Sequence, residues 1–384
     1  TTDTRKIIVE PAPTIEAGDP VTICQSSSPA PLTLSGASFG GGATTAAWSI
    51  TSGGGTLSST AQTANPQNVN YTPAVDFYGE VVLTLTSDAP GTCEEVLDTK
   101  LIKIDPVPIV DAGGPDTICQ STSPEPISLT GATVGGGAST AAWTITTGGG
   151  TLSSTAQTAN PESITYTPAT GYIGTVTLTL TTNTPNICTA VTDTREVTVE
   201  PAPIVDAGSN IDICQTETPE AISLTGANIG GGASTAAWSI SSGGGTLSST
   251  EQTNSPQNVI YTPAAGYTGE INLVLTTNAP GTCVAIEDNL LITINPAATI
   301  NAGEDQTICS NDAATMVGSF GGGATSGTWT TSGSGTFSDN SPTAVYTPST
   351  NDISAGSVNL TYTTNDPDGP FEAVSDSRML TIKE

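Results

Sequence analysis

The chain has 384 residues, with 36 Asp and Glu against 7 Lys and Arg, a net charge of −29 and no His. Because phosphate binding needs clustered cations, this balance excludes nucleic acid as an expected partner. Without His, neither a Ser-His-Asp nor a Cys-His catalytic group can form, and we expect no enzymatic activity. The abundance of Thr, Ser, Val and Ile favours an all-β fold, since β-branched side chains fit a pleated sheet.

The first ten residues match the end of a later repeat. Asp3-Thr4-Arg5-Lys6-Ile7-Ile8-Val9-Glu10 aligns with the stretch from Asp193 to Glu200. Residues 1–10 are therefore predicted to be the last strand of a preceding repeat, which implies a larger parent protein. No signal peptide opens the chain and no run of about 18 apolar residues occurs, so we expect a mature segment that does not insert into a membrane.

The rest of the chain is built from one unit copied four times. Cysteines recur every 95 residues, at Cys24, Cys119, Cys214 and Cys309. A unit of this length suits one sandwich domain of about 100 residues better than a turn of a solenoid. Prolines at the joints set the predicted bounds: repeat 1 (11–105), repeat 2 (106–200), repeat 3 (201–295) and repeat 4 (296–384), of which repeat 4 is divergent.

The period-two pattern predicts seven short strands in repeat 2. They are expected at residues 116–119, 126–130, 141–146, 151–153 and 163–167, in the stretch containing Val176, Leu178 and Leu180, and in a closing strand with Val197 and Val199. Glycine runs such as Gly40–Gly42 and Gly53–Gly55 lack the Lys and the following helix of a phosphate loop, and we expect exposed turns there.

One Trp in each repeat is predicted to fill its core: Trp48, Trp143, Trp238 and Trp329. Seven short strands around one Trp are typical of an immunoglobulin-like β-sandwich. The fold class we predict is all-β, with four tandem sandwiches. Because short proline joints keep neighbours from folding back, we expect an extended rod.

Several motifs resemble a known family. The run from Asn301 to Cys309, the central Trp and the closing strand that begins with Asp resemble PKD-type immunoglobulin-like domains. Tandem copies with Tyr-Thr-Pro and paired Cys resemble more closely the repeats of large SprB-like cell-surface adhesins of gliding Bacteroidota. The resemblance covers all four repeats, but its motifs are structural. It implies secretion across the outer membrane and gliding motility on the cell surface, and it identifies no ligand residue.

Cysteine spacing predicts three disulfides. The pairs Cys24 with Cys93, Cys119 with Cys188, and Cys214 with Cys283 are each 69 positions apart. Three equal spacings favour one intradomain bridge per repeat and an oxidising compartment. The alternative is buried free thiols; zinc is disfavoured without His or Cys-x-x-Cys. In repeat 4, Phe371 stands where a partner would be, so Cys309 is expected to be unpaired and buried.

Acidic residues near the proline joints are candidates for calcium, which takes hard oxygen ligands. The candidates are Glu10, Glu16, Asp98, Asp105, Asp111, Asp193, Glu200 and Asp206. Calcium would stiffen the first three joints. The alternative is a solvated acidic surface that keeps an extracellular protein soluble, with Asx-type turns at these positions.

We expect a non-enzymatic segment of a bacterial cell-surface adhesin or filament, located outside the cell at the outer membrane, that spaces a distal adhesive region and carries force. Its partners would be further repeats of the same parent chain and an unknown surface or polysaccharide. Two alternatives stay open. The first is a carbohydrate-binding module array of a secreted enzyme. Phe77, Tyr172 and Tyr267 could form aromatic platforms for sugars; the alternative is rings packed at the edge of the core with their hydroxyls bonded to backbone. The second is a subunit of a strand-exchanged surface polymer, because a strand without its sheet invites pairing with another chain.

Overall fold

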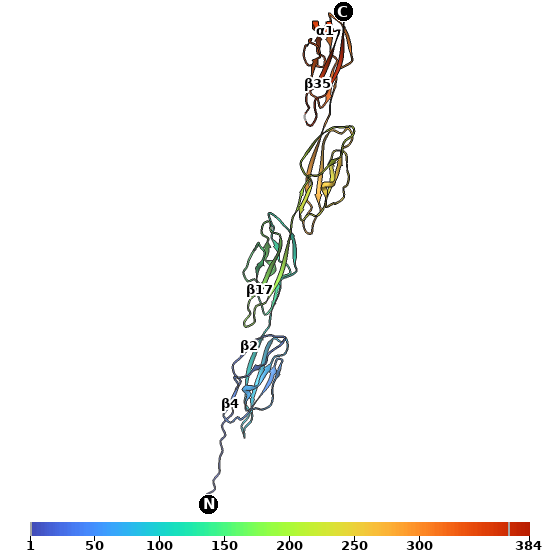
Figure 1. The fold of residues 1–384 in the computed structure, drawn as a ribbon. Helices are drawn as coiled ribbons and strands as arrows, with labels where there is room; N and C mark the ends of the chain where they lie inside the picture. Colours follow the sequence, from blue (N-terminus) through green and yellow to red (C-terminus); the bar gives the residue numbers. More distant parts are fainter. Residues whose placement is uncertain (1, 368) are drawn as a thin grey trace. The chain divides into compact units, whose positions relative to one another are not determined.

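A computed structural model describes residues 2–367 and 369–384 (Figure 1). The chain divides into two compact units, the first ending at Glu200 and the second beginning at Pro201. Each unit holds two of the four repeats. Strands dominate throughout, and within the described residues the one α-helix is the short Thr350–Ala355, so no helix there is long and apolar enough to cross a membrane.

Repeats 1 and 2 have matching element orders. Repeat 1 contains β1 (Thr14–Glu16), β2 (Val21–Cys24), β3 (Leu32–Thr33), β4 (Ser38–Gly40), β5 (Ala46–Ser52), β6 (Thr56–Leu57), the 3-10 helix η1 (Pro66–Asn68), β7 (Asn70–Thr72), β8 (Gly79–Ser87) and β9 (Leu97–Asp105). Repeat 2 contains β10 (Pro108–Asp111), β11 (Asp116–Cys119), β12 (Ile127–Ser128), β13 (Thr133–Gly136), β14 (Ala141–Thr147), β15 (Thr151–Leu152), η2 (Pro161–Ser163), β16 (Thr165–Thr167), β17 (Gly174–Thr182) and β18 (Thr192–Glu200).

Repeats 3 and 4 follow the same order, except that a helix is added in repeat 4. Repeat 3 contains β19 (Pro203–Asp206), β20 (Ile211–Cys214), β21 (Ile222–Ser223), β22 (Asn228–Gly231), β23 (Ala236–Ser242), β24 (Thr246–Leu247), η3 (Pro256–Asn258), β25 (Ile260–Thr262), β26 (Gly269–Thr277) and β27 (Glu287–Asn295). Repeat 4 contains β28 (Ala298–Asn301), β29 (Gln306–Cys309), β30 (Ala314–Thr315), β31 (Ser319–Gly322), β32 (Gly327–Thr331), β33 (Thr336–Phe337), β34 (Val345–Thr347), α1 (Thr350–Ala355), β35 (Ser357–Thr364) and β36 (Ser375–Lys383).

Three sheets recur in every repeat. In repeat 1 they have the orders β2-β9-β8-β5, β3-β7-β6 and β1-β4, and the other repeats repeat this grouping. In the four-stranded sheet, β2 runs parallel to β9, which is the last strand of the repeat in sequence. The pairs β9 with β8 and β8 with β5 are antiparallel. Two facing sheets with the Trp strand at one edge form an immunoglobulin-like sandwich. The predicted all-β fold of four immunoglobulin-like repeats is confirmed.

One Trp occupies the core of each repeat. In repeat 2, Trp143 and Tyr166 are fully buried and pack in one cluster with Leu178 and Leu180. The Trp143 indole donates a 3.0 Å hydrogen bond to the Pro161 carbonyl oxygen, so its one polar atom is satisfied inside the core. The equivalent residues Trp48, Trp238 and Trp329 are also buried. Burying a side chain of this size contributes about 3 kcal/mol.

The small sheet of each repeat was not predicted. In repeat 2, β13 ends with Gly135 and Gly136 and pairs with β10. We expected these glycines to interrupt the strands. The pairing of β4 with β1 likewise extends to Gly40. Glycine is a poor strand former, but backbone pairing with the strand that follows each joint is sufficient here.

Residues 2–10 form no strand in the structure. They run away from the sheets of repeat 1 as an extended segment (Figure 1), and Ile7, Ile8 and Val9 are 80%, 70% and 87% exposed. The residues that occupy the equivalent places of Ile7 and Val9 in β18, Val197 and Val199, are buried. The sequence of a last strand is present, therefore, but the segment has no strand partner among the described residues.

Candidate functional site: the joint between repeats 1 and 2

The site begins where the parallel strands β2 and β9 end together. Cys24 is opposite Asp105 in their register, and the Gln25 amide donates a 2.8 Å hydrogen bond to the Asp105 carbonyl oxygen. Since parallel strands share their carboxyl ends, the first strand of the repeat delivers a cysteine to the point where the chain leaves for repeat 2.

The second half of the site is the loop that follows β17 in repeat 2. The Cys188 amide donates a 2.9 Å hydrogen bond to the Pro185 carbonyl oxygen, which closes a tight turn. Asn186 lies inside this turn at a φ of 48°, in the left-handed region that Asn tolerates better than most residues. The turn directs the Cys188 side chain back toward the end of repeat 1.

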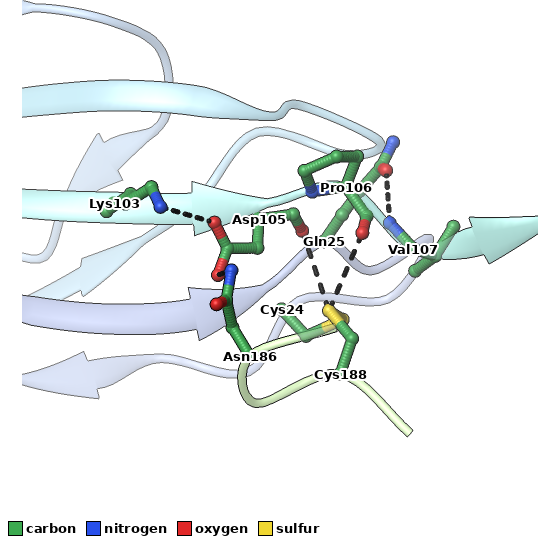
Figure 2. The surroundings of a disulfide bond; sticks show 8 residues. All are labelled: Cys24, Gln25, Lys103, Asp105, Pro106, Val107, Asn186 and Cys188. Atoms are coloured by element: carbon green, nitrogen blue, oxygen red, sulfur yellow. Dashed lines mark hydrogen bonds and ion pairs between the residues drawn. A yellow bond between two sulfur atoms is a disulfide. The ribbon is translucent and has the colours of Figure 1, made fainter. Parts of the chain in front are cut away.

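A disulfide joins the two halves (Figure 2). Cys24 and Cys188 are bonded, with Cα atoms 5.3 Å apart and 164 positions between them in the sequence. The Cys188 sulfur lies 3.8 Å from the Asp105 carbonyl oxygen and 3.6 Å from that of Pro106. A disulfide sulfur carries no proton, so we describe these as van der Waals contacts. The bond fastens repeat 2 to repeat 1 across the proline joint.

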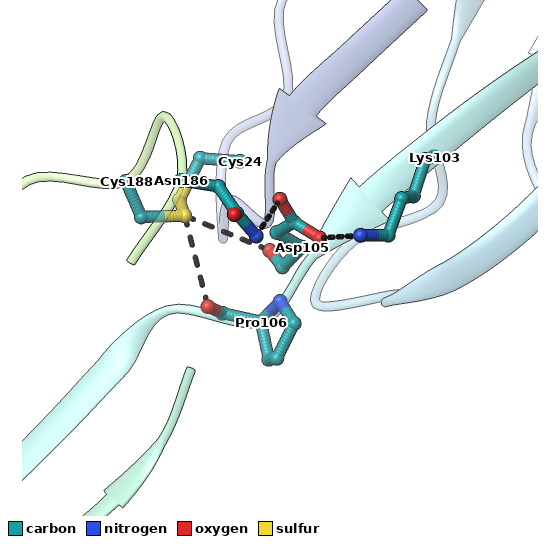
Figure 3. Close-up of polar contacts among 6 residues, drawn as sticks. All are labelled: Cys24, Lys103, Asp105, Pro106, Asn186 and Cys188. Carbon is teal, nitrogen blue, oxygen red and sulfur yellow. Dashed lines mark hydrogen bonds and ion pairs between the residues drawn. A yellow bond between two sulfur atoms is a disulfide. The ribbon is translucent and has the colours of Figure 1, made fainter. Parts of the chain in front are cut away.

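A carboxylate network surrounds the disulfide (Figure 3). Asp105 accepts a 2.8 Å hydrogen bond from the Asn186 side chain and forms a 3.0 Å ion pair with Lys103. The Lys103 hydrogen bond lowers the pKa of the Asp105 carboxyl; burial opposes this shift, and the Asn186 hydrogen bond adds to it. The carboxylate is thus held in its charged form between the two repeats.

Gln25 completes the joint on the side of repeat 1. Its side-chain oxygen accepts a 3.1 Å hydrogen bond from the Val107 amide, and its nitrogen donates a 2.7 Å bond to the Asp76 carbonyl oxygen. One amide side chain therefore ties the first residues of repeat 2 to a loop of repeat 1. Together with the disulfide, it leaves the proline joint little conformational freedom.

The predicted intradomain pairing is wrong. Cys24 bonds Cys188 and not Cys93, Cys188 is consequently unable to bond Cys119, and Cys214, the predicted partner of Cys283, is a free thiol. Cys119 and Cys283 are also disulfide-bonded, and they occupy the same places in their repeats as Cys24 and Cys188.

Geometry explains the error. Cys24 lies opposite the last residue of β9, whereas Cys93 comes before its first residue, Leu97. A nine-residue strand spans roughly 27 Å at about 3.3 Å per residue, and a disulfide needs Cα atoms within about 7 Å. The two cysteines of one repeat therefore lie at opposite ends of the sandwich and cannot meet.

Cys93, Cys214 and Cys309 are free thiols. Cys309 was predicted to be unpaired, and it is; its predicted burial is wrong, because the residue is exposed. Cys309 is the last residue of β29, as Cys24 is the last residue of β2. Cys24 is bonded to Cys188 in the loop of the next repeat, whereas Cys309 has no such loop beside it among the described residues. Burial raises the pKa of the Cys214 thiol, which favours its protonated form.

The joint between repeats 3 and 4 lacks the bridge. Cys214 ends β20 as Cys24 ends β2, but the loop after β35 contains no Cys and has Phe371 instead. The loop still approaches the end of repeat 3, since a Cβ atom added to Gly369 would lie 2.6 Å from the Asn295 side-chain nitrogen. Gly369 therefore lies next to Asn295 at the end of repeat 3 without a disulfide beside it.

The calcium candidates are mostly bound to backbone amides. Asp98 and Asp193 each accept a 2.7 Å hydrogen bond from the amide of Ala17 or Ala112 in their own repeat. The side chains of Glu16, Asp111 and Asp206 each accept a hydrogen bond from the backbone amide two residues later, and for the two Asp residues this is an Asx-type turn. The Glu10 side chain accepts a hydrogen bond from the Thr92 amide, and Asp105 lies in the joint described above. At Glu200 the backbone carbonyl oxygen accepts a hydrogen bond from the Gln120 amide. Among the described residues the acidic side chains do not gather in groups of three or more that could hold a metal. Calcium binding stays a prediction.

Two of the aromatic candidates, Phe77 and Tyr267, line a groove that recurs beside the cysteine of the first strand. In repeat 1 the groove includes Phe77 and has a volume of about 360 Å³. In repeat 3 it includes Tyr267 and has a volume of about 250 Å³, and the corresponding groove of repeat 2 has a volume of about 270 Å³. The hydroxyls of Tyr172 and Tyr267 donate to the carbonyl oxygens of Thr175 and Glu270 at 3.1 and 3.0 Å. The hydroxyls of both rings are thus bonded to backbone, and both side chains are partly buried.

No family model and no curated protein matches this chain. Its fold is similar to that of solved structures of tandem domains. The eight N-terminal immunoglobulin domains of Down Syndrome Cell Adhesion Molecule share 11% identity over 98% of this chain, at a TM-score of 0.46, and the chain spans 50% of their length. Titin domains I67–I69 share 13% identity with this chain, over 73% of this chain and 99% of the titin chain, at a TM-score of 0.41. The extracellular domain of protocadherin GammaB4 shares 13% identity, over 97% of this chain and 68% of the protocadherin chain, at a TM-score of 0.35.

Proposed function

We propose that this chain is a non-enzymatic spacer segment of a bacterial cell-surface adhesin or filament. Its task is to hold a distal adhesive region away from the cell and to carry force between the two. The observation that carries the proposal is the Cys24–Cys188 disulfide, which joins one immunoglobulin-like repeat covalently to the next. A bond in this place strengthens the connection between domains and contributes nothing to a catalytic site.

The disulfide also supports an extracellular location, because such bonds persist in oxidising compartments. The net charge of −29 fits a solvated surface outside the cell. Attachment to the outer membrane, and a place among the SprB-like gliding adhesins of Bacteroidota, rest on the motif resemblance. Further repeats of the same parent chain are the nearest partners, and the distal region would bind a surface or polysaccharide.

The test is made on the native parent protein in its host. Antibodies raised against this chain should label intact cells in electron microscopy, at a distance from the membrane. A strain carrying Cys24→Ser with Cys188→Ser should keep the label but adhere less under flow, while Cys214→Ser is the matched control and should adhere normally. Label confined to the cell interior, or no change in adhesion under flow, would contradict the proposal.

A carbohydrate-binding array is the second candidate. The recurring groove with Phe77 or Tyr267 at its wall favours it, since aromatic faces bind sugars. A glycan array probed with the whole chain decides the matter. Binding that is abolished by Phe77→Ala with Tyr267→Ala, and kept by the exposed change Tyr78→Ala, would establish this function in place of the spacer.

A further inference from the structure

Repeat 4 contains an open groove beside a buried arginine. The groove has a volume of about 480 Å³, and it is lined by the turn between β28 and β29, by β30 and the chain that leads into β31, and by Arg378 of β36. Arg378 is only 4% exposed. A cationic group held inside the sandwich therefore borders a space large enough for a small molecule.

The Arg378 guanidinium is short of hydrogen-bond acceptors. Its Nε atom is buried and has no partner among the described residues. One terminal nitrogen donates a 3.0 Å hydrogen bond to the Gln306 side-chain oxygen, and the other donates to the Ala302 carbonyl oxygen at 3.5 Å, which is a long and weak bond. A buried charged donor without an acceptor is costly, so an anionic group that reaches Nε would be bound favourably.

Repeat 2 shows which group this guanidinium accommodates. There Nε and one terminal nitrogen of Arg195 donate to a single carboxylate oxygen of Asp116, at 2.9 and 2.7 Å. Asp116 is the first residue of β11, and Gln306 is the first residue of the equivalent strand β29. The Nε edge of Arg378 therefore suits one carboxylate, which no described residue of repeat 4 supplies.

Two carboxylates line the same groove. Glu304 and Asp305 lie in the turn between β28 and β29, where repeat 2 has uncharged residues. Asp305 accepts a 2.8 Å hydrogen bond from the Met379 amide, whereas the exposed Glu304 side chain accepts none among the described residues. Burial lowers the pKa of the Arg378 guanidinium, and the charges of Asp305 and Glu304 oppose this shift. Because these two carboxylates repel a simple anion, a ligand that suits the groove must also carry a positive charge.

We propose that this groove binds a zwitterionic ligand of the α-amino acid class. The ligand carboxylate takes the position beside Nε of Arg378 that the Asp116 carboxylate takes in repeat 2, and it displaces the Gln306 side chain. The ligand ammonium group lies toward Glu304, and an apolar ligand side chain lies toward Val317, which lines the groove and is 71% exposed. The whole site lies in one repeat, so the proposal stands whether or not the repeats serve as a spacer.

Arginine-selective ¹⁵N labelling of the full chain gives a direct test, because the arginines of the sequence are Arg5, Arg195 and Arg378 alone. The probe is L-leucine. It should shift the Nε–H signal of Arg378 saturably, with a dissociation constant on the order of 1 mM, as expected for a small ligand held by two charged contacts in an open groove. The Arg195 signal is the internal control and should not move, because its Nε already donates to Asp116.

Two changes at Gln306 separate ligand binding from folding. Gln306→Asp places the protein's own carboxylate beside Nε, as in repeat 2, and should weaken leucine binding by about tenfold or more. Gln306→Ala removes the competing side chain and should bind leucine at least as tightly as the parent chain does. Glu304→Gln should weaken binding by about two- to fivefold, as for an exposed ion pair, whereas the exposed change Glu372→Gln lies outside the groove and should have no effect.

Two analogues of leucine test the ligand class. Isocaproate lacks the ammonium group and should bind several-fold more weakly, and isoamylamine lacks the carboxylate and should leave the Arg378 signal in place. The proposal is overturned if leucine does not move this signal or if the Gln306→Asp chain binds leucine as the parent chain does. It is also overturned if isocaproate or inorganic phosphate binds as tightly as leucine, since the groove would then select a negative charge alone.

Discussion

In repeats 2 and 4 an arginine occupies the same place in the last strand, opposite Leu178 in one and Leu360 in the other. Arg195 forms two bonds to Asp116, at 2.9 Å from Nε and 2.7 Å from a terminal nitrogen. In repeat 4 the place of Asp116 is taken by Gln306, whose side-chain oxygen accepts a 3.0 Å hydrogen bond from a terminal nitrogen of Arg378. The Nε atom of Arg378 has no hydrogen-bond partner among the described residues.

The same two repeats differ at the joint and at one added helix. The loop of repeat 2 carries Cys188, whereas that of repeat 4 carries Phe371. In repeat 4, Ser349 caps α1, and the Asp352 carboxylate accepts hydrogen bonds from the amides of Ser334 and Gly335 and from the Tyr346 hydroxyl. In the other repeats the corresponding Tyr hydroxyl donates to a glycine carbonyl oxygen.

The two repeats share a frame, which is the Trp core and the four-stranded sheet, and they differ in the polar and covalent contacts added to it. Trp143 and Trp329 fill their cores in the same manner, and both four-stranded sheets have the same strand order. The bridge, the buried ion pair and the carboxylate network vary independently on that frame. A repeat can therefore lose its covalent connection and still keep its fold.

The largest effect is expected from removing the bridge. Cys24→Ser with Cys188→Ser opens a loop of 164 residues, which should destabilise the pair of repeats by roughly 5 kcal/mol relative to the state with both unfolded. Guanidinium unfolding followed by hydrogen exchange in peptides of repeats 1 and 2 measures the loss. Cys214→Ser, which removes a free thiol, is the control. Equal stability of the two variants would show that the bridge does not couple the repeats.

Adding a cysteine to repeat 4 tests the comparison in the opposite direction. Phe371→Cys should form a disulfide with Cys214, because the loop already contacts the end of repeat 3 near Asn295. We expect a gain of roughly 2 to 4 kcal/mol for repeats 3 and 4 together. Phe371→Ser controls for the lost ring. If Cys214 still reacts with a thiol reagent after oxidation, the two joints do not share one geometry.

The stability of repeat 4 should depend on acid through the buried carboxylate of Asp352. Burial alone would raise the pKa of Asp352, but the hydrogen bonds from Ser349, Ser334 and Tyr346 lower it to about 2. A carboxyl with an ordinary pKa of about 3.9 when unfolded then contributes roughly 2.6 kcal/mol above that pH, and the contribution is lost as the pH falls through about 2.

Asp352→Asn should remove this dependence. Urea unfolding of repeat 4 at pH 6 and pH 2, read by hydrogen exchange, compares the variant with the parent chain. The parent should lose stability between these values, and the variant should start lower and lose less. An identical acid response in both would mean that another group is responsible.

Completing the ion pair of repeat 4 should have a smaller effect. Gln306→Asp gives Arg378 the carboxylate that Asp116 gives Arg195, and we expect a gain of about 1 to 2 kcal/mol from the charge-assisted bonds. The reciprocal change Asp116→Gln should cost repeat 2 a similar amount. Thermal unfolding resolved by repeat measures both, and a loss of stability on Gln306→Asp would refute the explanation.

Calcium should have the smallest effect, because the candidate carboxylates are occupied by backbone amides. We expect millimolar calcium to stabilise each of the first three joints by no more than about 0.4 kcal/mol, which corresponds to a dissociation constant near the calcium concentration used. Titration calorimetry should detect weak heat that falls on Asp111→Asn and Asp206→Asn, with Asp212→Asn as the control. If no heat develops and chelator leaves the melting temperature unchanged, the calcium prediction is wrong.

Side-chain patterns were sufficient to predict much of the frame. The alternation of Val176, Leu178 and Leu180 with threonines locates β17, and the repeated Trp locates the core, because both depend on which face of a strand is buried. The sheet of β10 and β13 escaped prediction because its pairing depends on the backbone of Gly135 and Gly136, which carries no such pattern. The helix α1 was missed for its brevity, although Ser349 and Asp352 form a capping box.

The disulfide pairing could not be derived from spacing. With a period of 95 residues, the bond from Cys24 to its own repeat and the bond from Cys24 to the next repeat recur with equal regularity. Only the parallel pairing of β2 with β9 decides between them, because it places Cys24 at the far end of the sandwich from Cys93. Parallel pairing of a first and a last strand is a long-range contact, and no local sequence signal reports it.

The Cys24–Cys188 bond has one more consequence, for proteolytic damage. A protease that cuts the backbone anywhere from Gln25 to Ile187 produces two fragments that remain joined through sulfur, since one fragment contains Cys24 and the other contains Cys188. Exposed turns such as the one at Gly53 lie within this range. The chain can therefore be nicked in most of its first two repeats and still connect what lies on either side, until a reductant reaches the bridge.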